Sequence, residues 1–339
     1  MIDETTKAIL LLTTYFSGEK NRPFNPLTPI EWGRFAEHLH ARNFSPDSLF
    51  SHELDKVFEG FADKKISKER VSYLLGRGAS LALSLEKWER SGIWILTRGS
   101  DEYPGLLKKR LGAKSPPLLF GYGNAKLLNT PSVAVVGSRD VDDNDIKFSR
   151  SVAVTAASQG YSIVSGGARG VDEAAMRGAI EAEGTAVGIL ANSLLRASTS
   201  VAYRRHLNEG NLVLVSPFNP EAGFSVGNAM QRNKYIYCMS RAAVVVHSGL
   251  SGGTWNGAVE NLKQGWVPLF VRKNEDLKAG NTKLVEQGGR WIKYNPSLID
   301  FTIFERDPEK EINNTKSENK SSYDEHKGNV QLDLFVSDK

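Results

Sequence analysis

The 339-residue chain contains one cysteine, Cys238. A lone thiol cannot form an intramolecular disulfide, and it cannot supply the ligands of a Cys-based structural zinc site or an iron–sulfur cluster. We therefore expect a protein of a reducing compartment. As a separate expectation, no residue set in the sequence indicates a metal or another cofactor. Neither sign of charge dominates, because 43 Lys and Arg face 39 Asp and Glu. A formal net charge of +4 is too small to argue for nucleic-acid binding by itself.

Long apolar runs are also absent. The apolar run near the N-terminus, Ala8–Leu12, is far shorter than the roughly 20 residues of a membrane span. We expect neither a signal peptide nor an anchor, no membrane association, and a cytoplasmic location. The G-x-G-x-x-G fingerprint of dinucleotide dehydrogenases and the Walker lysine loop of P-loop ATPases are missing too, which disfavours both enzyme classes.

The pattern along the chain predicts three regions: a helical N-terminal domain over 1–100, an α/β domain over 101–300 and a disordered tail over 301–339. In the first region apolar residues recur at helical spacing. The turn Leu74–Ala79 is there either a plain inter-helix turn or a helical hairpin that grips a DNA backbone. In the tail, residues 313–329 are nearly all Asn, Ser, Lys and Glu, a composition that predicts disorder.

From Val133 onward, short apolar runs alternate with amphipathic segments of helical length. The runs are Val133–Val136, Ile163–Val164, Ala186–Leu190, Leu212–Val215, Val244–Val246 and Val267–Val271. Runs that are apolar on both faces and separated by helices predict a mostly parallel sheet covered on both sides, which is a doubly wound, Rossmann-like α/β fold. In such folds ligands bind beyond the carboxyl ends of the strands.

Glycine-rich turns follow three of these predicted strands. The predicted phosphate-binding residues in them are Gly137, Ser138 and Arg139, then Ser165, Gly166, Gly167 and Arg169, then Ser251, Gly252, Gly253 and Thr254. Glycines let backbone N–H groups approach an anion, the next helix adds its dipole, and hydroxyl groups complete the cradle. Each turn has a bland alternative, because such turns often serve packing alone. Three in one sheet, two of them with arginine, favour phosphate binding.

A second basic group lies before the fifth predicted strand, at Arg232, Asn233 and Lys234. Cations followed by Tyr235 and Tyr237 suit a chain of phosphates whose bases stack on aromatic rings. In the alternative, the tyrosines are core residues of a helix and the cations form its solvated face.

Several of these segments together resemble the DNA-processing protein A (DprA/Smf) family over roughly residues 100–295. The segments are Asp101–Leu107, Pro116–Gly121, Val135–Arg139, Ser165–Ala175, Arg232–Lys234 and Gly280–Leu284. The resemblance implies an extended Rossmann fold that binds single-stranded DNA in a basic pocket, homodimerises and helps to load the RecA recombinase, without catalysis.

The chain also departs from the family pattern. It has Met176 where the family has His, Lys234 where the family has Arg, and no Tyr-Pro motif around residues 194–203. The usual Ser-Gly-Ser turn is replaced by Ser251–Trp255. We interpret the chain as a divergent branch, for which a role in a mobile element or in phage defence is as compatible as one in transformation.

Two other functions remain open from the residues. Gly252–Thr254 and Arg232 resemble part of the motif of the lysine-decarboxylase-like phosphoribohydrolases, and that resemblance implies a catalytic glutamate one turn after the threonine. That position is Gly257, and the nearest acid, Glu260, lies almost two turns on, so the carboxylate for an oxocarbenium-like state is misplaced. A nucleotide sensor would use the same turns without chemistry.

No catalytic constellation is visible in the sequence. His206, Cys238 and His247 have no Ser/His/acid or Cys/His spacing around them. His247 directly ends an apolar strand, where a satisfied core or rim histidine is the expected role. We predict that the protein is not an enzyme.

The last residues turn apolar again. The pentad Gln331, Leu332, Asp333, Leu334 and Phe335 resembles the peptide that binds bacterial DNA polymerase sliding clamps. An apolar pentad at the end of a solvated linker suits a docking peptide. In the alternative, the pentad folds back onto the α/β domain as an edge strand or short helix.

Overall fold

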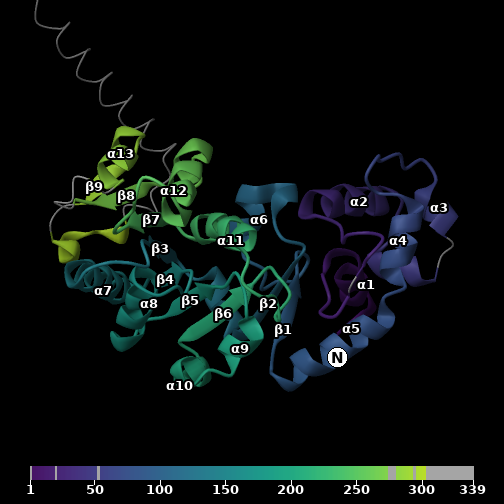
Figure 1. Ribbon diagram of the computed structural model, residues 1–339, viewed down its shortest axis with the longest axis horizontal. Coiled ribbons are helices and arrows are strands. Elements are labelled where there is room, and N and C mark those ends of the chain that lie inside the picture. Colours follow the sequence, from purple (N-terminus) through teal and green to yellow (C-terminus); the bar gives the residue numbers. More distant parts are fainter. Residues whose placement is uncertain (1, 20, 52–53, 274–279, 293–294, 303–339) are drawn as a thin grey trace, which may run out of the picture. The chain divides into compact units, whose positions relative to one another are not determined.

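The computed structural model describes residues 2–19, 21–51, 54–273, 280–292 and 295–302 (Figure 1). The described residues up to Ile299 belong to one compact unit, which ends before Asp300. The predicted disordered tail, except for its first two residues, and the pentad Gln331–Phe335 lie outside the described residues. The division between a helical domain and a sheet domain at residue 100 stays a prediction.

The described part of the first 90 residues is mainly helical, as the apolar spacing predicts. The helices are α1 (Glu4–Thr13), α2 (Pro29–Ala41), α3 (Leu54–Phe58), α4 (Lys68–Leu75) and α5 (Gly78–Arg90). Between α4 and α5, the buried Arg77 holds its Nη1 atom 3.0 Å from the carboxylate of Glu19. The cation of this turn is therefore engaged inside the protein, which favours the plain inter-helix turn over a hairpin that grips DNA.

One nine-stranded sheet forms the centre of the fold. Its strands are β1 (Trp94–Thr97), β2 (Leu118–Gly123), β3 (Ser132–Val136), β4 (Ser162–Ser165), β5 (Ala186–Ile189), β6 (Leu212–Ser216), β7 (Ala242–Val245), β8 (Leu269–Arg272) and β9 (Arg290–Ile292). Their order is β1-β2-β6-β5-β4-β3-β7-β8-β9. Only the β1–β2 and β2–β6 pairs are antiparallel. The predicted mostly parallel α/β fold is confirmed, whereas β2 and β9 were not predicted as strands.

The connecting helices cover both faces of this sheet. They are α6 (Gly105–Leu111), α7 (Asp143–Ser158), α8 (Val171–Glu181), α9 (Leu194–Ser198), α10 (Val201–Glu209), α11 (Val226–Met239), α12 (Gly253–Gln264) and α13 (Asn281–Glu286). Figure 1 shows α7 and α8 together on one side of the sheet and α11 and α12 on the other. From β3 the chain first winds towards β6, and α11 then returns it to β7 on the other side of β3. Such reversals of direction create the crevices in which doubly wound folds bind ligands.

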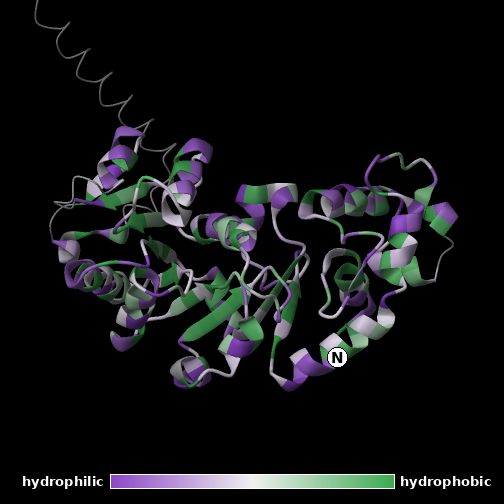
Figure 2. Cartoon of the chain, viewed as in Figure 1, coloured by the Kyte–Doolittle hydropathy of each residue, from purple (hydrophilic) through white to green (hydrophobic). Residues whose placement is uncertain are grey.

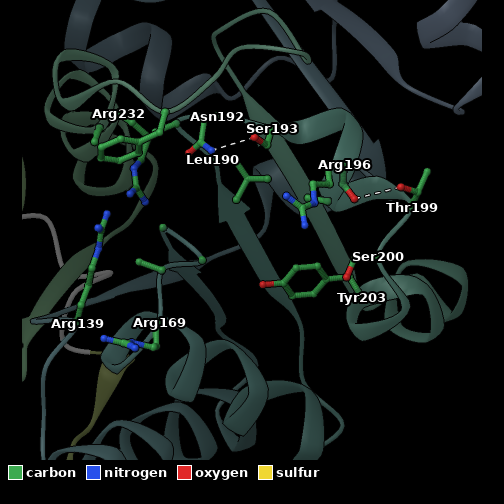
Figure 3. Close-up of a pocket in the computed structure, with 17 residues that line it drawn as sticks. Arg139, Arg169, Leu190, Asn192, Ser193, Arg196, Thr199, Ser200, Tyr203 and Arg232 are labelled. Atoms are coloured by element: carbon green, nitrogen blue, oxygen red, sulfur yellow. Dashed lines mark hydrogen bonds between the residues drawn. The ribbon is translucent and has the colours of Figure 1, made fainter.

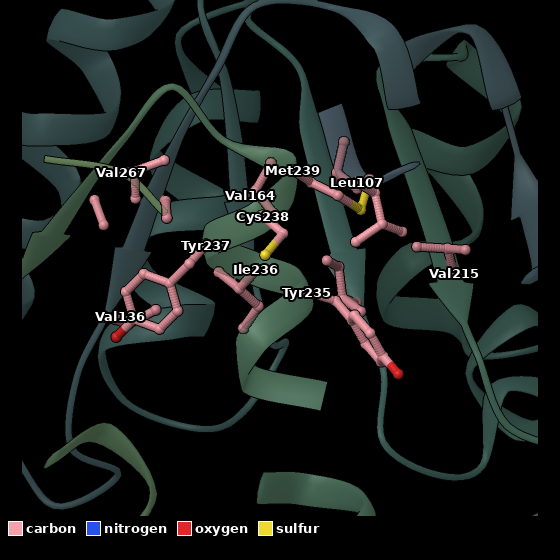
Figure 4. Close-up of a cluster of buried hydrophobic side chains, with 14 of the residues drawn as sticks. Leu107, Val136, Val164, Val215, Tyr235, Ile236, Tyr237, Cys238, Met239 and Val267 are labelled. Atoms are coloured by element: carbon pink, nitrogen blue, oxygen red, sulfur yellow. The ribbon is translucent and has the colours of Figure 1, made fainter. Parts of the chain in front are cut away.

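Helix α11 lies in the core. All five residues of its last part, Tyr235–Met239, are buried, because the helix contacts α6, α12 and three strands (Figure 4). Figure 2 shows apolar strands between helices of mixed hydropathy, as expected for a sheet that is covered on both faces. In the part of the chain that the structure describes, no helix combines the length and the apolarity needed to cross a membrane.

Candidate functional site

A cleft of about 740 Å³ lies where β3, β4 and β5 end. The turns after these strands, helices α9 and α10, and one side of α11 form its walls (Figure 3). Among the described residues that line it, four are arginines and none is acidic. The four arginines are Arg139, Arg169, Arg196 and Arg232. Because the described lining is cationic, the cleft has the electrostatics of an anion-binding site.

Arg232 forms the floor of the cleft and is only 5% exposed. Its Nη1 donates a hydrogen bond to the carbonyl oxygen of Ile189 at 3.0 Å, and its Nε has no partner among the residues described. Burial lowers the pKa of Arg232, and the charge of Asp172 partly offsets this effect. A Cβ atom on Gly166 would lie 1.3 Å from Nη1. Gly166 therefore leaves the space that the guanidinium group occupies.

The turn after β4 binds a carboxylate of the protein itself. The N–H of Gly166 donates to Oδ2 of Asp172 at 3.1 Å, and burial raises the pKa of this carboxyl group. The prediction that the backbone of this turn cradles a phosphate is therefore not supported at Gly166, because its amide already has an internal anion. Gly167 has a φ of +64° and lines the cleft, as does the exposed Arg169.

The turn after β3 serves mainly packing. A Cβ atom on Gly137 would lie 2.4 Å from Cγ2 of Val171, at the start of α8. The Ser138 Oγ accepts the N–H of Asp140 at 3.2 Å. The packing alternative therefore accounts for Gly137 and Ser138, and Arg139 is the residue of this turn that lines the cleft.

Two arginines face each other across the cleft. Figure 3 shows the guanidinium groups of Arg139 and Arg232 pointing toward one another, and the like charge of Arg139 lowers the pKa of Arg232. The Cζ of Arg139 also lies 5.8 Å from the ring centroid of Phe224, a side chain that is 60% exposed. An anion bound here would relieve the repulsion between the two guanidinium groups. The exposed ring of Phe224 lies beside it and is open to stacking.

Lys234 does not share this cleft. Its Nζ lies 5.1 Å from the ring centroid of Tyr235, and burial lowers its pKa. Residues two apart on a helix do not face the same way, so Arg232 and Lys234 point to different sides of α11. Of the four cations that the sequence assigns to phosphate binding, Arg139, Arg169 and Arg232 line the cleft and Lys234 does not.

The third predicted turn also lies elsewhere. Asn233 donates from Nδ2 to the carbonyl oxygen of Gly253 at 3.0 Å and so joins α11 to the start of α12. Of the turn itself, Ser251, Gly252 and Gly253 are exposed and Thr254 is partly buried, and none of them lines the cleft.

The prediction of base stacking on the tyrosines of α11 is wrong. Tyr235 and Tyr237 are 2% and 1% exposed, and both belong to the core. The alternative that treats them as core residues is confirmed. The exposed ring beside the arginines is that of Phe224.

The opposite wall of the cleft was not predicted. It contains residues of α9, of the start of α10 and of the turns around them (Figure 3), namely Asn192, Ser193, Arg196, Thr199, Ser200 and Tyr203. The available signal was their position directly after the predicted strand Ala186–Leu190. This strand end contains no glycine, so it lacks the pattern that marks the other three turns.

His247 is paired with a carboxylate, and Cys238 is buried. Nδ1 of His247 lies 3.1 Å from Oδ2 of Asp145, and Oδ1 of the same carboxylate pairs with Arg272. Burial raises the pKa of the Cys238 thiol to about 12, so the thiol is protonated at neutral pH. Glu260 is exposed and does not line the cleft. In the described ranges, no group of three or more His, Cys, Asp or Glu is arranged to hold a metal ion.

Known proteins match this chain over the sheet and the cleft. The family model described as DNA recombination-mediator protein A matches residues 94–302. The putative DNA processing protein DprA of Mycobacterium tuberculosis is 29% identical over 233 residues, which cover 64% of this chain and 59% of that protein. Protein Smf of Escherichia coli is 32% identical over 192 residues, which cover 55% of this chain and 50% of that protein. The chain thus spans between half and three fifths of these relatives.

A solved structure shares the fold over most of the chain. DNA processing protein A of Streptococcus pneumoniae superposes with a TM-score of 0.68 at 20% sequence identity, covering 88% of this chain and 97% of that one. The expected extended Rossmann-like architecture is therefore confirmed.

Proposed function

The chain belongs to the DNA recombination-mediator protein A family, and from this membership we propose that it binds single-stranded DNA in the arginine-lined cleft. The observation that carries the proposal is the composition of the cleft, whose described lining contains four arginines and no acidic residue. Phosphates neutralise such clustered guanidinium groups and release counterions, which supplies affinity without reading the sequence.

Phe224 favours a single strand over a duplex. Its exposed ring lies beside Arg139, so a base could stack on it while the neighbouring phosphate binds the guanidinium group. Only unpaired bases offer a free face for such stacking. Because every base has such a face, the preference for particular sequences is weak.

Fluorescence anisotropy tests this function directly. Labelled oligothymidylate, a duplex of the same length and a labelled mononucleotide are titrated with the full chain at several salt concentrations. Single-strand binding that weakens as salt rises, with weaker binding of the duplex, supports the proposal. Tight binding of the mononucleotide alone would instead support the nucleotide-sensor alternative.

We do not propose catalysis. A phosphoribohydrolase requires a carboxylate beside the oxocarbenium-like carbon. The described lining residues supply none, and Glu260 lies outside the cleft. Hydrolysis of a mononucleotide that is lost in Arg232→Ala would overturn this inference.

We also propose three partners. A second copy of the chain would extend the surface that one strand contacts, and Trp291, 39% exposed on the outermost strand β9, offers an apolar contact for it. RecA recombinase is proposed because members of this family are expected to load it. The sliding clamp is proposed as the partner of Gln331–Phe335.

A further inference from the structure

A second cavity adjoins the cleft between α7 and α8. Its volume is about 470 Å³, and Arg139 and Arg169 line both it and the cleft. Arg150 of α7 and Arg177 of α8 add two further guanidinium groups to its walls. A backbone that passes between Arg139 and Arg169 would therefore leave one cationic surface and enter another.

A third cavity offers a competing exit. Its volume is about 490 Å³, and it shares Ser200 and Tyr203 with the cleft. Its charged lining consists of Glu173, Glu181 and Arg177, so carboxylates outnumber guanidinium groups. The cavity between α7 and α8 has four arginines against two acids, Asp140 and Glu173. The lining of the cavity between α7 and α8 attracts a phosphodiester chain, and the lining of the third cavity repels it. The strand is therefore expected to leave the cleft between α7 and α8.

We propose that the DNA strand held in the cleft continues past Arg139 and Arg169 into the cavity between α7 and α8, where Arg150 binds its phosphates. This inference rests on the proposed single-strand binding and adds a path for the strand outside the cleft. The ligand is the same phosphodiester backbone, now several phosphates longer.

The backbone of Arg150 is closely packed, whereas its guanidinium group is only weakly paired. A Cβ atom on Gly178 of α8 would lie 3.0 Å from the Cα of Arg150, so the two helices approach closely at this point. The Nη1 of Arg150 lies 3.5 Å from the Glu181 carboxylate, and its Nε has no hydrogen-bond partner among the residues described. Glu181 also pairs with Arg177 at 3.6 Å. Long, half-exposed ion pairs of this kind contribute little, so a phosphate can displace Glu181 from Arg150.

The length of the bound strand is the measurement that tests the path. Oligothymidylates from about 4 nucleotides upward are titrated against wild type and Arg150→Gln, which keeps most of the side chain that packs near Gly178. We expect wild type to gain affinity with length, and Arg150→Gln to lose roughly tenfold of that gain while it binds the shortest oligomers like wild type. The log–log salt slope for long oligomers should flatten by about 0.7 for each phosphate that the variant no longer binds.

Two variants serve as controls. Arg90→Gln removes an equally charged side chain, paired with Glu86 on α5, and should leave binding unchanged at every length. His206→Gln changes the third cavity and should also have no effect. The proposed path is overturned if affinity rises with oligonucleotide length equally in wild type and Arg150→Gln. It is also overturned if His206→Gln, and not Arg150→Gln, loses this rise in affinity. Failure of wild type to bind any single strand would overturn the proposed function itself.

Discussion

The guanidinium group of Arg232 occupies the space in which a side chain of residue 166 would begin, 1.3 Å from the position of a Cβ atom on Gly166. The floor of the cleft thus depends on a glycine that is distant in the sequence. The missing Cβ has a steric reason there, because the φ of Gly166 is not in the left-handed region.

Gly166→Ala should displace Arg232 and break its hydrogen bond to Ile189. We expect a loss of about 1–3 kcal/mol in the free energy of unfolding, as for other overpacked sites, together with weaker DNA binding. Urea denaturation and anisotropy measure the two effects. Gly99→Ala is the matched control, because its Cβ would meet nothing closer than 3.6 Å. Wild-type behaviour of Gly166→Ala in both assays would contradict the assigned role of the glycine.

Arg139→Ala should flatten the salt dependence of binding. Each phosphate of a single strand that the protein no longer neutralises flattens the slope of log affinity against log salt concentration by about 0.7. Lys234→Ala removes the same charge from outside the cleft and should leave the slope at its wild-type value. A flatter slope in Lys234→Ala would instead support the sequence-based placement of Lys234 in the site.

Phe224→Ala should weaken binding by about 1–3 kcal/mol, the usual contribution of a stacked base. The salt slope should stay the same because the substitution removes no charge. Leu83→Ala, at a position 72% exposed on α5, is the control for removal of an apolar side chain from the surface. If Phe224→Ala binds single strands as tightly as wild type, its ring is not a stacking surface.

Cys238 should contribute to alkaline destabilisation. Its pKa rises from an ordinary value of 9.0 to about 12 in the folded protein, so the unfolded chain releases this proton first as the pH increases. Its contribution to stability is therefore complete below pH 9.0 and is lost as the pH rises towards about 12. The free energy of unfolding, obtained from urea denaturation between these limits, should fall less steeply with pH in Cys238→Ala than in wild type. The difference in slope is at most about 1.4 kcal/mol per pH unit. Parallel curves for the two proteins would count against the buried thiol.

A labelled peptide of residues 326–339 should bind purified sliding clamp. Leu334→Ala/Phe335→Ala should abolish binding, because the two apolar side chains are expected to fill the hydrophobic cleft of the clamp. Fluorescence anisotropy at peptide concentrations up to tens of micromolar is sufficient. Binding that is unchanged by the double substitution, or no binding at all, would favour the alternative in which this pentad folds back.

The central strands could be predicted because parallel strands buried on both faces are apolar at every position, as β3 is over Val133–Val136. β2 contains Gly121 and Gly123, and β9 has only three residues, so neither produced a clear strand pattern. Lys234 was grouped with Arg232 because the two are close in the sequence. On helix α11, however, residues two apart point to different sides, so only Arg232 lines the cleft.

The different roles of the glycines could not be read from the sequence. Gly137 accommodates Val171, and Gly166 accommodates Arg232. Both glycines follow a strand in a similar turn, and only the side chains brought against them by the fold distinguish the two.

The edge strand at the opposite side of the sheet from β9 is β1, which comes from the residues before position 100. Trp94 of this strand lies across Gly121 of β2, where a Cβ atom would be 2.1 Å from its ring, and its Nε1 donates to the carbonyl oxygen of Gly123 at 2.9 Å. Trp88 of α5 packs edge-on against Phe120, with ring centroids 5.1 Å apart. A protein expressed from residue 101 would lose both tryptophans and present β2 as a bare, apolar edge that invites pairing between molecules. The sheet that bears the cleft therefore depends for one of its edges on residues before position 100.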